Sequence, residues 1–223
     1  MLVSHSKKFI FLKTVKTAGT SIEGFLERFC MPDSDFTPTH HRPETVSTVG
    51  IIGQRGSFAR DKITYYNHMP AKEVKQLLGE DIWSEYTKIS AIRNPYDKVV
   101  SRFFFDKVRT EPDRLKNKDL FTIRTEFETF IKAGNIRSDR AIYTINNEVS
   151  VNYFIRYEHL HKDLQVLSTM LDLDFDPSLL PTYKSEYRRR DLKLVDLISP
   201  EYASIIENVY EFEFKEFGYT PLY

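Results

Sequence analysis

The sequence contains a single cysteine, Cys30, among its 223 residues. One thiol excludes an internal disulfide and a metal site built from several cysteines, and it fits a protein of a reducing compartment. Net charge is also absent, because 32 Lys and Arg residues balance 32 Asp and Glu residues. The molecule as a whole therefore has no charge that favours nucleic acid or a membrane surface, and any anion site must be local.

Long apolar runs are missing as well. The run "FIFL" near the amino terminus is far too short to span a bilayer, and no charged, apolar and cleavable segments of a signal peptide precede it. We therefore expect a soluble, cytoplasmic protein with no membrane span, although a luminal catalytic domain trimmed of its anchor would have the same features.

The stretch "KKFIFLKTVKTAGTSIEGFLERF", residues 7–29, predicts a buried strand followed by a helix. Apolar residues recur at helical spacing from Ser21, with Thr20 or Ser21 as the predicted N-cap. A strand, a glycine-containing turn and a helix N-terminus direct unpaired backbone N–H groups at one point, which suits an anion. Lys16 adds a cation to this turn.

The turn lacks the pattern GxxxxGK[ST], since Gly19 stands alone and Lys16 precedes it. An ordinary nucleotide-hydrolase loop is therefore disfavoured. The alternative is a plain strand-to-helix connection with a solvated lysine.

A second predicted strand, "YTKISAI", leads into "RNPYDKVVSRFFF". Pro95 favours a helix that starts near this point, which leaves Arg93 at the carboxyl end of the strand and Ser101 about two helical turns further on. A guanidinium group with a nearby hydroxyl suits a terminal phosphate. A structural ion pair is the competing interpretation of Arg93.

Together these stretches resemble a known family. "LKTVKTAGTS" resembles the 5′-phosphosulfate loop, and "AIRNPYDKVVSRFF" the 3′-phosphate motif, of sulfotransferases that use 3′-phosphoadenosine 5′-phosphosulfate (PAPS). Residues 151–173 and the C-terminal "SPEYASIIENVYEFEFKEFGY" also resemble parts of that family. The carbohydrate O-sulfotransferases of the heparan and chondroitin type, with their bacterial relatives, are the most similar members.

The resemblance implies that PAPS is the cosubstrate and that no metal ion is needed. Lys16 would then be catalytic and contact the phosphosulfate, while Arg93 and Ser101 would hold the 3′-phosphate. The remaining residues expected to bind the 5′-phosphate are the loop residues that follow the lysine: Thr17, Ala18, Gly19, Thr20 and Ser21.

Six histidines compete for the role of catalytic base, and His68 is our choice. It follows a short β-like run at residues 63–66 and precedes a helix that we expect between Pro70 and Gly79. Relatives that modify glycans carry a catalytic histidine at such a position, and a neutral imidazole accepts a proton at neutral pH. We interpret His40 and His41 as loop residues, and His159 and His161 as surface residues.

The basic cluster "TYKSEYRRRDLK", residues 182–193, is the best match to the loop that closes over the nucleotide in this family, although no Gly-rich version of it is present. Ser185 and Arg189 are the predicted nucleotide contacts there. A solvated charged helix face is an equally good explanation.

The predicted fold is α/β: a P-loop-like, three-layer domain over residues 1–223 with a mainly parallel central sheet flanked by helices. Residues 33–62, expected to be a substrate-facing loop, and 107–150, which contain an amphipathic piece, would be acceptor-side insertions. The predicted function is transfer of the sulfuryl group to a hydroxyl, on a carbohydrate or another acceptor. The rivals are a kinase or nucleotide hydrolase with a degenerate P-loop, and a non-catalytic module that binds nucleotide or glycan.

Overall fold

The computed structural model describes residues 1–32, 39, 41–56, 63–111, 113, 115, 117–181 and 191–223. The chain divides into two compact units. The sheet unit consists of Met1–Ile92 and Asp139–Tyr183, and the helical unit of Arg93–Ser138 and Lys184–Tyr223. Each unit is described by itself, so the single domain expected over residues 1–223 stays a prediction.

The sheet unit is built on six strands, which lie in the order β3-β4-β1-β2-β5-β8. Their bounds are Thr45–Val46 (β3), Gly50–Ile52 (β4), Leu2–Ser4 (β1), Phe9–Leu12 (β2), Thr87–Ile92 (β5) and Tyr153–Arg156 (β8). β2, β5 and β8 run parallel, whereas β1, β4 and β3 continue the sheet with antiparallel pairs. The carboxyl ends of β2, β5 and β8 therefore share one edge of the sheet.

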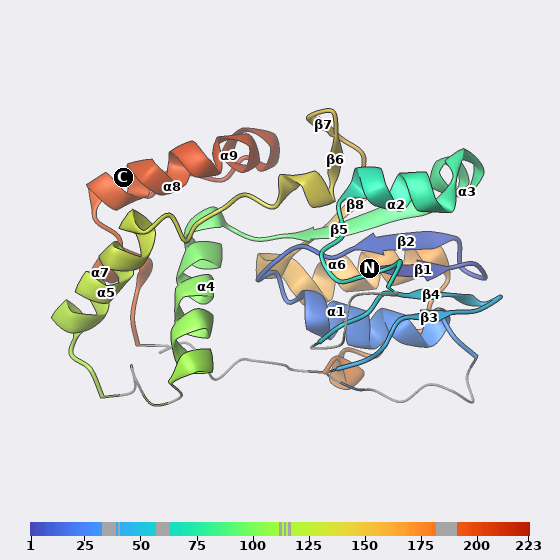
Figure 1. Ribbon diagram of the computed structural model, residues 1–223, viewed down its shortest axis with the longest axis horizontal. Helices are drawn as coiled ribbons and strands as arrows, with labels where there is room; N and C mark the ends of the chain where they lie inside the picture. The colour runs from blue at the N-terminus through green and yellow to red at the C-terminus, as the bar shows by residue number, and fades with distance from the viewer. Residues whose placement is uncertain are drawn as a thin grey trace. The chain divides into compact units, whose positions relative to one another are not determined.

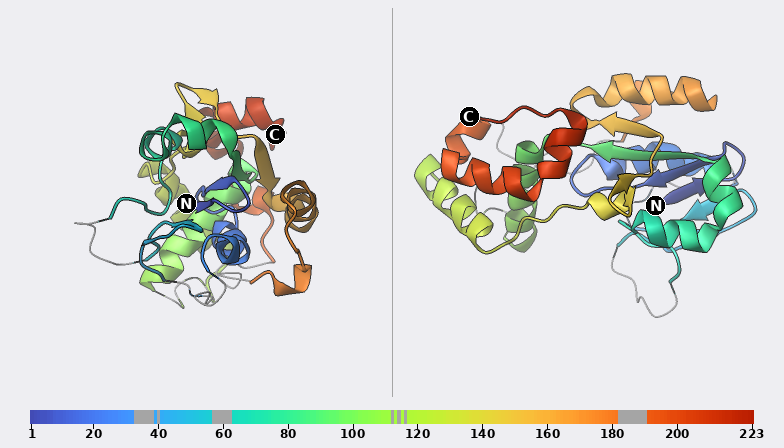
Figure 2. Two further views of the ribbon diagram at one scale, coloured as in Figure 1. Left: turned by 90° about the vertical axis from the view of Figure 1, so that its right-hand side faces the viewer. Right: turned by 90° about the horizontal axis from the view of Figure 1, so that it is seen from above.

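Successive side chains of a strand point to opposite faces of the sheet, and in β2 apolar side chains are buried on both faces. Phe9 and Phe11 pack with α1 (Gly19–Leu26) and α6 (Leu160–Leu171), while Ile10 and Leu12 pack with α2 (Ala71–Leu78) and α3 (Glu80–Glu85). Figure 1 shows α2 and α1 on opposite sides of the sheet, and Figure 2 shows α6 beside the edge strand β8. The predicted α/β fold, with a central sheet between helices, is confirmed.

Short elements complete the sheet unit. The 3₁₀ turn η1 (Glu27–Phe29) ends the α1 segment, and η4 (Tyr157–His159) connects β8 with α6. Another 3₁₀ turn, η3 (Arg140–Ile142), leads into the hairpin of β6 (Thr144–Ile145) and β7 (Glu148–Val149). The turn η5 (Pro177–Leu179) follows α6.

The helical unit has its own apolar core. Its helices are α4 (Pro95–Thr110), α5 (Leu120–Lys132), α7 (Leu194–Leu197), α8 (Pro200–Val209) and α9 (Glu211–Phe217). Phe103 of α4 lies against Phe127 and Phe130 of α5, with ring centroids 5.3 and 5.6 Å apart. The amphipathic helix that the sequence indicated around Phe127 is confirmed.

Two local predictions were wrong. Residues 33–62 are not simply a loop, because β3 and β4 lie within them and extend the sheet from β1 through backbone pairing. Residues 63–66 form no strand; among them only Tyr66 makes an isolated bridge, to Gln54. Whether a segment forms a strand depends on backbone pairing with other parts of the chain, which hydrophobic periodicity does not reveal.

No helix in the described part of the chain is both long and apolar enough to cross a membrane.

Candidate functional site

The β2–α1 turn, residues 13–18, has an unusual backbone. Lys16 and Ala18 both take left-handed conformations, with φ of 62° and 58°. Left-handed residues in a turn before a helix form a concave row of N–H groups that binds anions. None of the described side chains caps α1, which begins at Gly19 directly after Ala18. The turn and the first amides of α1 therefore form a cradle for a negatively charged group.

The prediction of Thr20 or Ser21 as the N-cap was wrong, since both lie inside α1. Ala18 is the residue at the cap position, with φ 58° and ψ 15°, and its carbonyl accepts from Ser21 N and Ile22 N. A side-chain cap normally needs an extended backbone at this position. Because no side-chain cap is present at Ala18, the first N–H groups of α1 are suited to a hydrogen-bond acceptor from outside the helix, such as a bound anion.

Hydrogen bonds within the sheet unit hold the turn in place. The Thr14 and Thr17 hydroxyls lie 2.8 Å apart, and Thr14 Oγ1 donates to the carbonyl of Ala91 in β5 at 2.5 Å. Val15 N donates to Asp139 Oδ2 at 2.6 Å. Thr17 is buried, so its hydroxyl serves the turn and its backbone N–H is the group it can offer to a ligand.

Lys13, which the sequence analysis did not single out, is a buried part of this site. Its Nζ donates to Glu23 Oε2 at 2.7 Å and to Thr20 Oγ1 at 3.1 Å. A Cβ on Gly19 would stand 2.7 Å from Lys13 Cγ, so glycine is needed for the lysine to pass the start of α1. Burial lowers the pKa of Lys13 to about 8, although Glu23 acts in the opposite direction.

Glu23 is the centre of a buried charge cluster. Arg55 Nη1 lies 2.6 Å from Glu23 Oε2 and 2.8 Å from Glu27 Oε1, while Arg42 contacts both carboxylates. Burial favours the protonated form of Glu23, but Lys13, Arg42 and Arg55 outweigh this effect and hold its pKa well below the usual value. A buried carboxylate needs such partners, because an uncompensated charge is costly in the interior. Arg42 and Arg55 belong to residues 33–62, so part of the segment predicted to be a substrate-facing loop is buried.

His68 lies directly against this cluster. It has a left-handed backbone (φ 62°), and its Nδ1 is 3.0 Å from the carbonyl oxygen of Lys13. Because a carbonyl only accepts, Nδ1 carries the hydrogen and Nε2 keeps a lone pair. Burial, with the charge of Lys13, lowers the pKa of His68 to about 4. The geometry thus produces a neutral imidazole next to the β2–α1 turn.

The predicted second anion site falls in the helical unit and begins at the residue that follows β5. Arg93 is buried, and its Nε and Nη2 donate to Asp97 Oδ2 at 2.6 and 2.5 Å. The side chain of Asn94 accepts from Tyr96 N at 3.0 Å and so caps α4. Ser101 is half-buried on the same helix. The ion pair considered as an alternative for Arg93 is present, with Asp97 as the partner.

The other predicted residues have simpler outcomes. Ser185, Arg189 and His40 lie outside the described residues. His159 and His161 are exposed, as predicted. Within the described ranges, no group of three or more His, Cys, Asp or Glu side chains is arranged to hold a metal ion.

Comparison with known proteins gives one match, to a protein family. A search of curated proteins and a search of solved structures each found no match. A family model described as "Sulfotransferase family" matches residues 1–220. Because this match covers nearly the whole sequence, the chain belongs to the sulfotransferase family.

Proposed function

We propose that this sulfotransferase transfers the sulfuryl group of PAPS to a hydroxyl of a carbohydrate. The observation that carries the proposal is the β2–α1 turn, where Lys16 and Ala18 have left-handed backbones directly before α1, which no described side chain caps. A helix N-terminus of this kind, next to a lysine, fits a phosphate group. The carbohydrate acceptor rests on the resemblance of the two motifs to glycan O-sulfotransferases.

Lys16 and the start of α1 would hold the donor at its 5′ end. PAPS supplies an activated sulfuryl group, whose transfer leaves negative charge on a phosphate oxygen. The Lys16 ammonium group would stabilise that charge, as in phosphoryl transfer. Backbone N–H groups would bind the phosphate, with the Thr20 and Ser21 hydroxyls as further donors. The backbone groups belong to Thr17, Ala18, Gly19 and Thr20, whereas Ser21 would contribute its hydroxyl, because its own N–H donates to Ala18 O at 2.9 Å.

His68 would act as the general base. Its Nδ1–H bond to Lys13 O fixes the tautomer, so Nε2 is the atom that takes the proton of the acceptor hydroxyl. The hydroxyl oxygen then forms the new bond to sulfur, while the bond from sulfur to the phosphate oxygen breaks and the proton stays on His68. Because its pKa is lowered to about 4, His68 begins this step in the neutral form at physiological pH.

Arg93 and Ser101 would bind the 3′-phosphate. The support for this assignment is that Arg93 directly follows the carboxyl end of β5, and that Asp97 orients its guanidinium group. Ser185 and Arg189 stay proposed nucleotide contacts outside the described residues. The scheme calls for no metal ion.

The test is calorimetric titration with the product nucleotide 3′-phosphoadenosine 5′-phosphate (PAP), with ATP and AMP for comparison. We expect binding that requires the 3′-phosphate and is lost in Arg93→Ala. Arg102→Ala is the matched control, because Arg102 lies in the same unit, on α4, and also pairs with an aspartate four residues later, with Nε 2.7 Å from Asp106 Oδ2. A preference for ATP with magnesium, or no binding of PAP, would overturn the proposal.

A further inference from the structure

Lys13 directly follows β2 and contacts two parts of the proposed site. Its carbonyl oxygen lies 3.0 Å from His68 Nδ1, and its Nζ donates to Thr20 Oγ1 at 3.1 Å. Thr20 is in the first turn of α1, where we place the 5′-phosphate of the donor. One buried residue therefore joins the proposed base to the proposed phosphate cradle.

The path of the Lys13 side chain is fixed along its length. A Cβ on Gly19 would stand 2.7, 3.3 and 3.0 Å from Cγ, Cδ and Cε of the lysine, so the chain passes directly over the start of α1. At its end, Nζ also donates to Glu23 Oε2 at 2.7 Å. A side chain that is ordered before a ligand binds loses little further entropy on binding.

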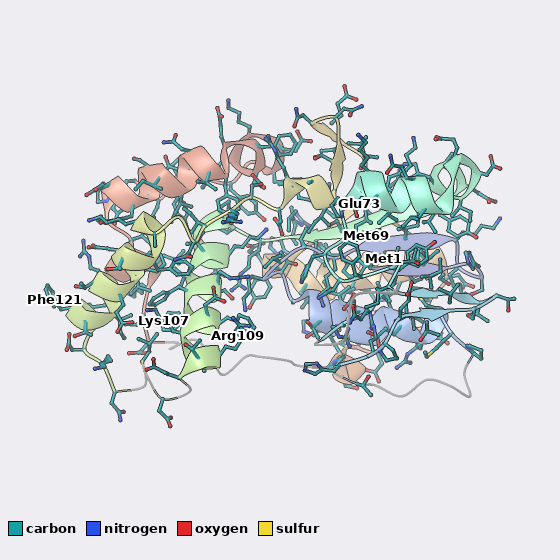
Figure 3. All side chains as sticks on the ribbon, viewed as in Figure 1. Met1, Met69, Glu73, Lys107, Arg109 and Phe121 are labelled. Carbon is teal, nitrogen blue, oxygen red and sulfur yellow. The ribbon has the colours of Figure 1, made fainter. Side chains whose placement is uncertain are left out.

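His68 is anchored on the other side of this contact. Met69, which follows His68 and is labelled in Figure 3, is buried in the same apolar cluster as Leu12. Leu12 is the last residue of β2 and precedes Lys13. Apolar packing and the hydrogen bond to Lys13 O therefore hold the histidine beside the end of β2.

The hydrogen bond between Lys13 and Thr20 has one direction. An ammonium group has no lone pair, and Lys13, with a pKa of about 8, is mainly in that form at pH 7. Thr20 Oγ1 is therefore the acceptor, and its own hydrogen is left for another oxygen. Within the described ranges this hydroxyl makes no second hydrogen bond, and Thr20 is only half-buried, which leaves it open to a ligand. A hydroxyl that accepts from a cation is also a stronger donor.

We propose that Lys13 is a positioning residue for the donor: its ammonium group directs the hydroxyl hydrogen of Thr20 toward the 5′-phosphate of PAPS. The inference deepens the function proposed above and rests on it. Because the carbonyl of the same residue orients His68, Lys13 would also fix the phosphate and the base relative to each other, as an in-line displacement requires. Lys13 itself touches neither the donor nor the acceptor in this scheme.

The test is calorimetric titration at pH 7 with PAP and with adenosine 3′-monophosphate, which lacks the 5′-phosphate. Lys13→Met keeps an unbranched apolar chain but removes the donor to Thr20, and Thr20→Val removes the hydroxyl. We expect each change to weaken PAP by about tenfold, the usual size of one hydrogen bond to a charged group, and to leave the other nucleotide unaffected. Thr20→Ser, which keeps the hydroxyl, should bind PAP as the wild type does.

Lys88→Met is the matched control. Lys88 is another buried lysine of the sheet, on β5, and its Nζ donates to the carbonyl of Trp83 at 2.9 Å. Its replacement removes a buried ammonium group without touching Thr20, so PAP affinity should stay the same. The double variant Lys13→Met/Thr20→Val should bind PAP no more weakly than Thr20→Val alone, because the lysine acts through the hydroxyl.

Three results would overturn the inference: unchanged PAP affinity in Lys13→Met or in Thr20→Val, equal weakening of both nucleotides, or additive effects in the double variant. Thr20→Val leaves the buried charges in place, so it decides the question even where Lys13→Met does not fold. No binding of PAP by the wild type would overturn the donor assignment together with the inference. PAP binding that neither change weakens would overturn the inference alone.

Discussion

Two segments of this protein have the same order of strand, turn and helix, but their helices begin differently. After β2, the turn contains left-handed residues at Lys16 and Ala18, and no described side chain caps α1. After β5, Asn94 accepts hydrogen bonds from Tyr96 N and Asp97 N and so caps α4. No described side chain satisfies the first amides of α1, whereas Asn94 satisfies two of the first amides of α4.

The difference assigns different chemistry to the two segments. A phosphate at the start of α1 would bind largely through backbone N–H groups and the helix dipole. An anion at the start of α4 would depend on side chains, above all Arg93, whose direction is set by Asp97. Five changes test this comparison, beginning with the largest expected effect.

Replacement of His68, the proposed base, should have the largest effect. His68→Asn keeps a residue that tolerates the left-handed backbone but removes the proton acceptor, so we expect turnover to fall by about 10²- to 10⁴-fold. PAP affinity, measured by calorimetry, should change little. His161→Asn, at an exposed position of the same unit, is the control. A variant that keeps its turnover would remove His68 from the mechanism.

Loss of the cation from the β2–α1 turn should come next. Lys16→Asn should lower turnover by about 10²-fold, because the charge that develops on the leaving oxygen loses its partner. Lys8→Asn is a close control: Lys8 also has a left-handed backbone (φ 49°) but lies before β2, where it pairs with Glu85 on the surface. Equal turnover in Lys16→Asn and Lys8→Asn would show that the Lys16 ammonium group does not take part in catalysis.

A methyl group at the start of α1 should disturb the buried lysine. Gly19→Ala would place a Cβ 2.7 Å from Lys13 Cγ, and we expect a loss of about 1–3 kcal/mol in the free energy of unfolding in urea. The double variant with Lys13→Ala should lose less than the sum of the single changes, since the clash is then absent. Strict additivity would contradict the role assigned to Gly19.

Acid should destabilise the fold through His68. The folded-state pKa of about 4 lies below the ordinary value of 6.5, because burial and the charge of Lys13 disfavour the imidazolium form. The unfolded state therefore binds the proton first, and the stabilisation present above pH 6.5 is lost as the pH falls toward 4. Between pH 7 and 5, the wild type should lose roughly 1–2 kcal/mol more than His68→Asn in urea unfolding. If His68→Asn lost more unfolding free energy than the wild type between pH 7 and 5, the pKa of His68 would not be lowered in the folded state.

The smallest effect concerns the capped helix. Asn94→Ala should cost about 1 kcal/mol of stability, measured by urea unfolding, because Tyr96 N and Asp97 N lose their acceptor. The corresponding change at α1, Ala18→Gly, should leave stability the same or raise it, since glycine adopts φ near 58° without strain. Similar losses at both positions would remove the contrast between the two helices.

Sequence patterns predicted a strand at "FIFL", residues 9–12, a strand at residues 86–92 and the helices that follow them. The structure confirms these elements, with the second strand at Thr87–Ile92. Their signals are local: apolar runs for the strands and Pro95 for the start of α4. The strand expected at residues 63–66 failed, and β3 and β4 were missed, since β4 depends on pairing with β1 near the amino terminus and β3 pairs in turn with β4.

The sequence by itself determined where the turns, the lysine and the histidine stand along the chain, because residue type and spacing are properties of short segments. Only the tertiary structure decided that Lys13 is buried between Glu23 and Thr20 and that its carbonyl fixes the tautomer of His68. It also decided that Arg42 and Arg55 neutralise Glu23. These contacts join different segments of the chain, and the energies that select them come from burial and charge, which exist only once the segments have packed together.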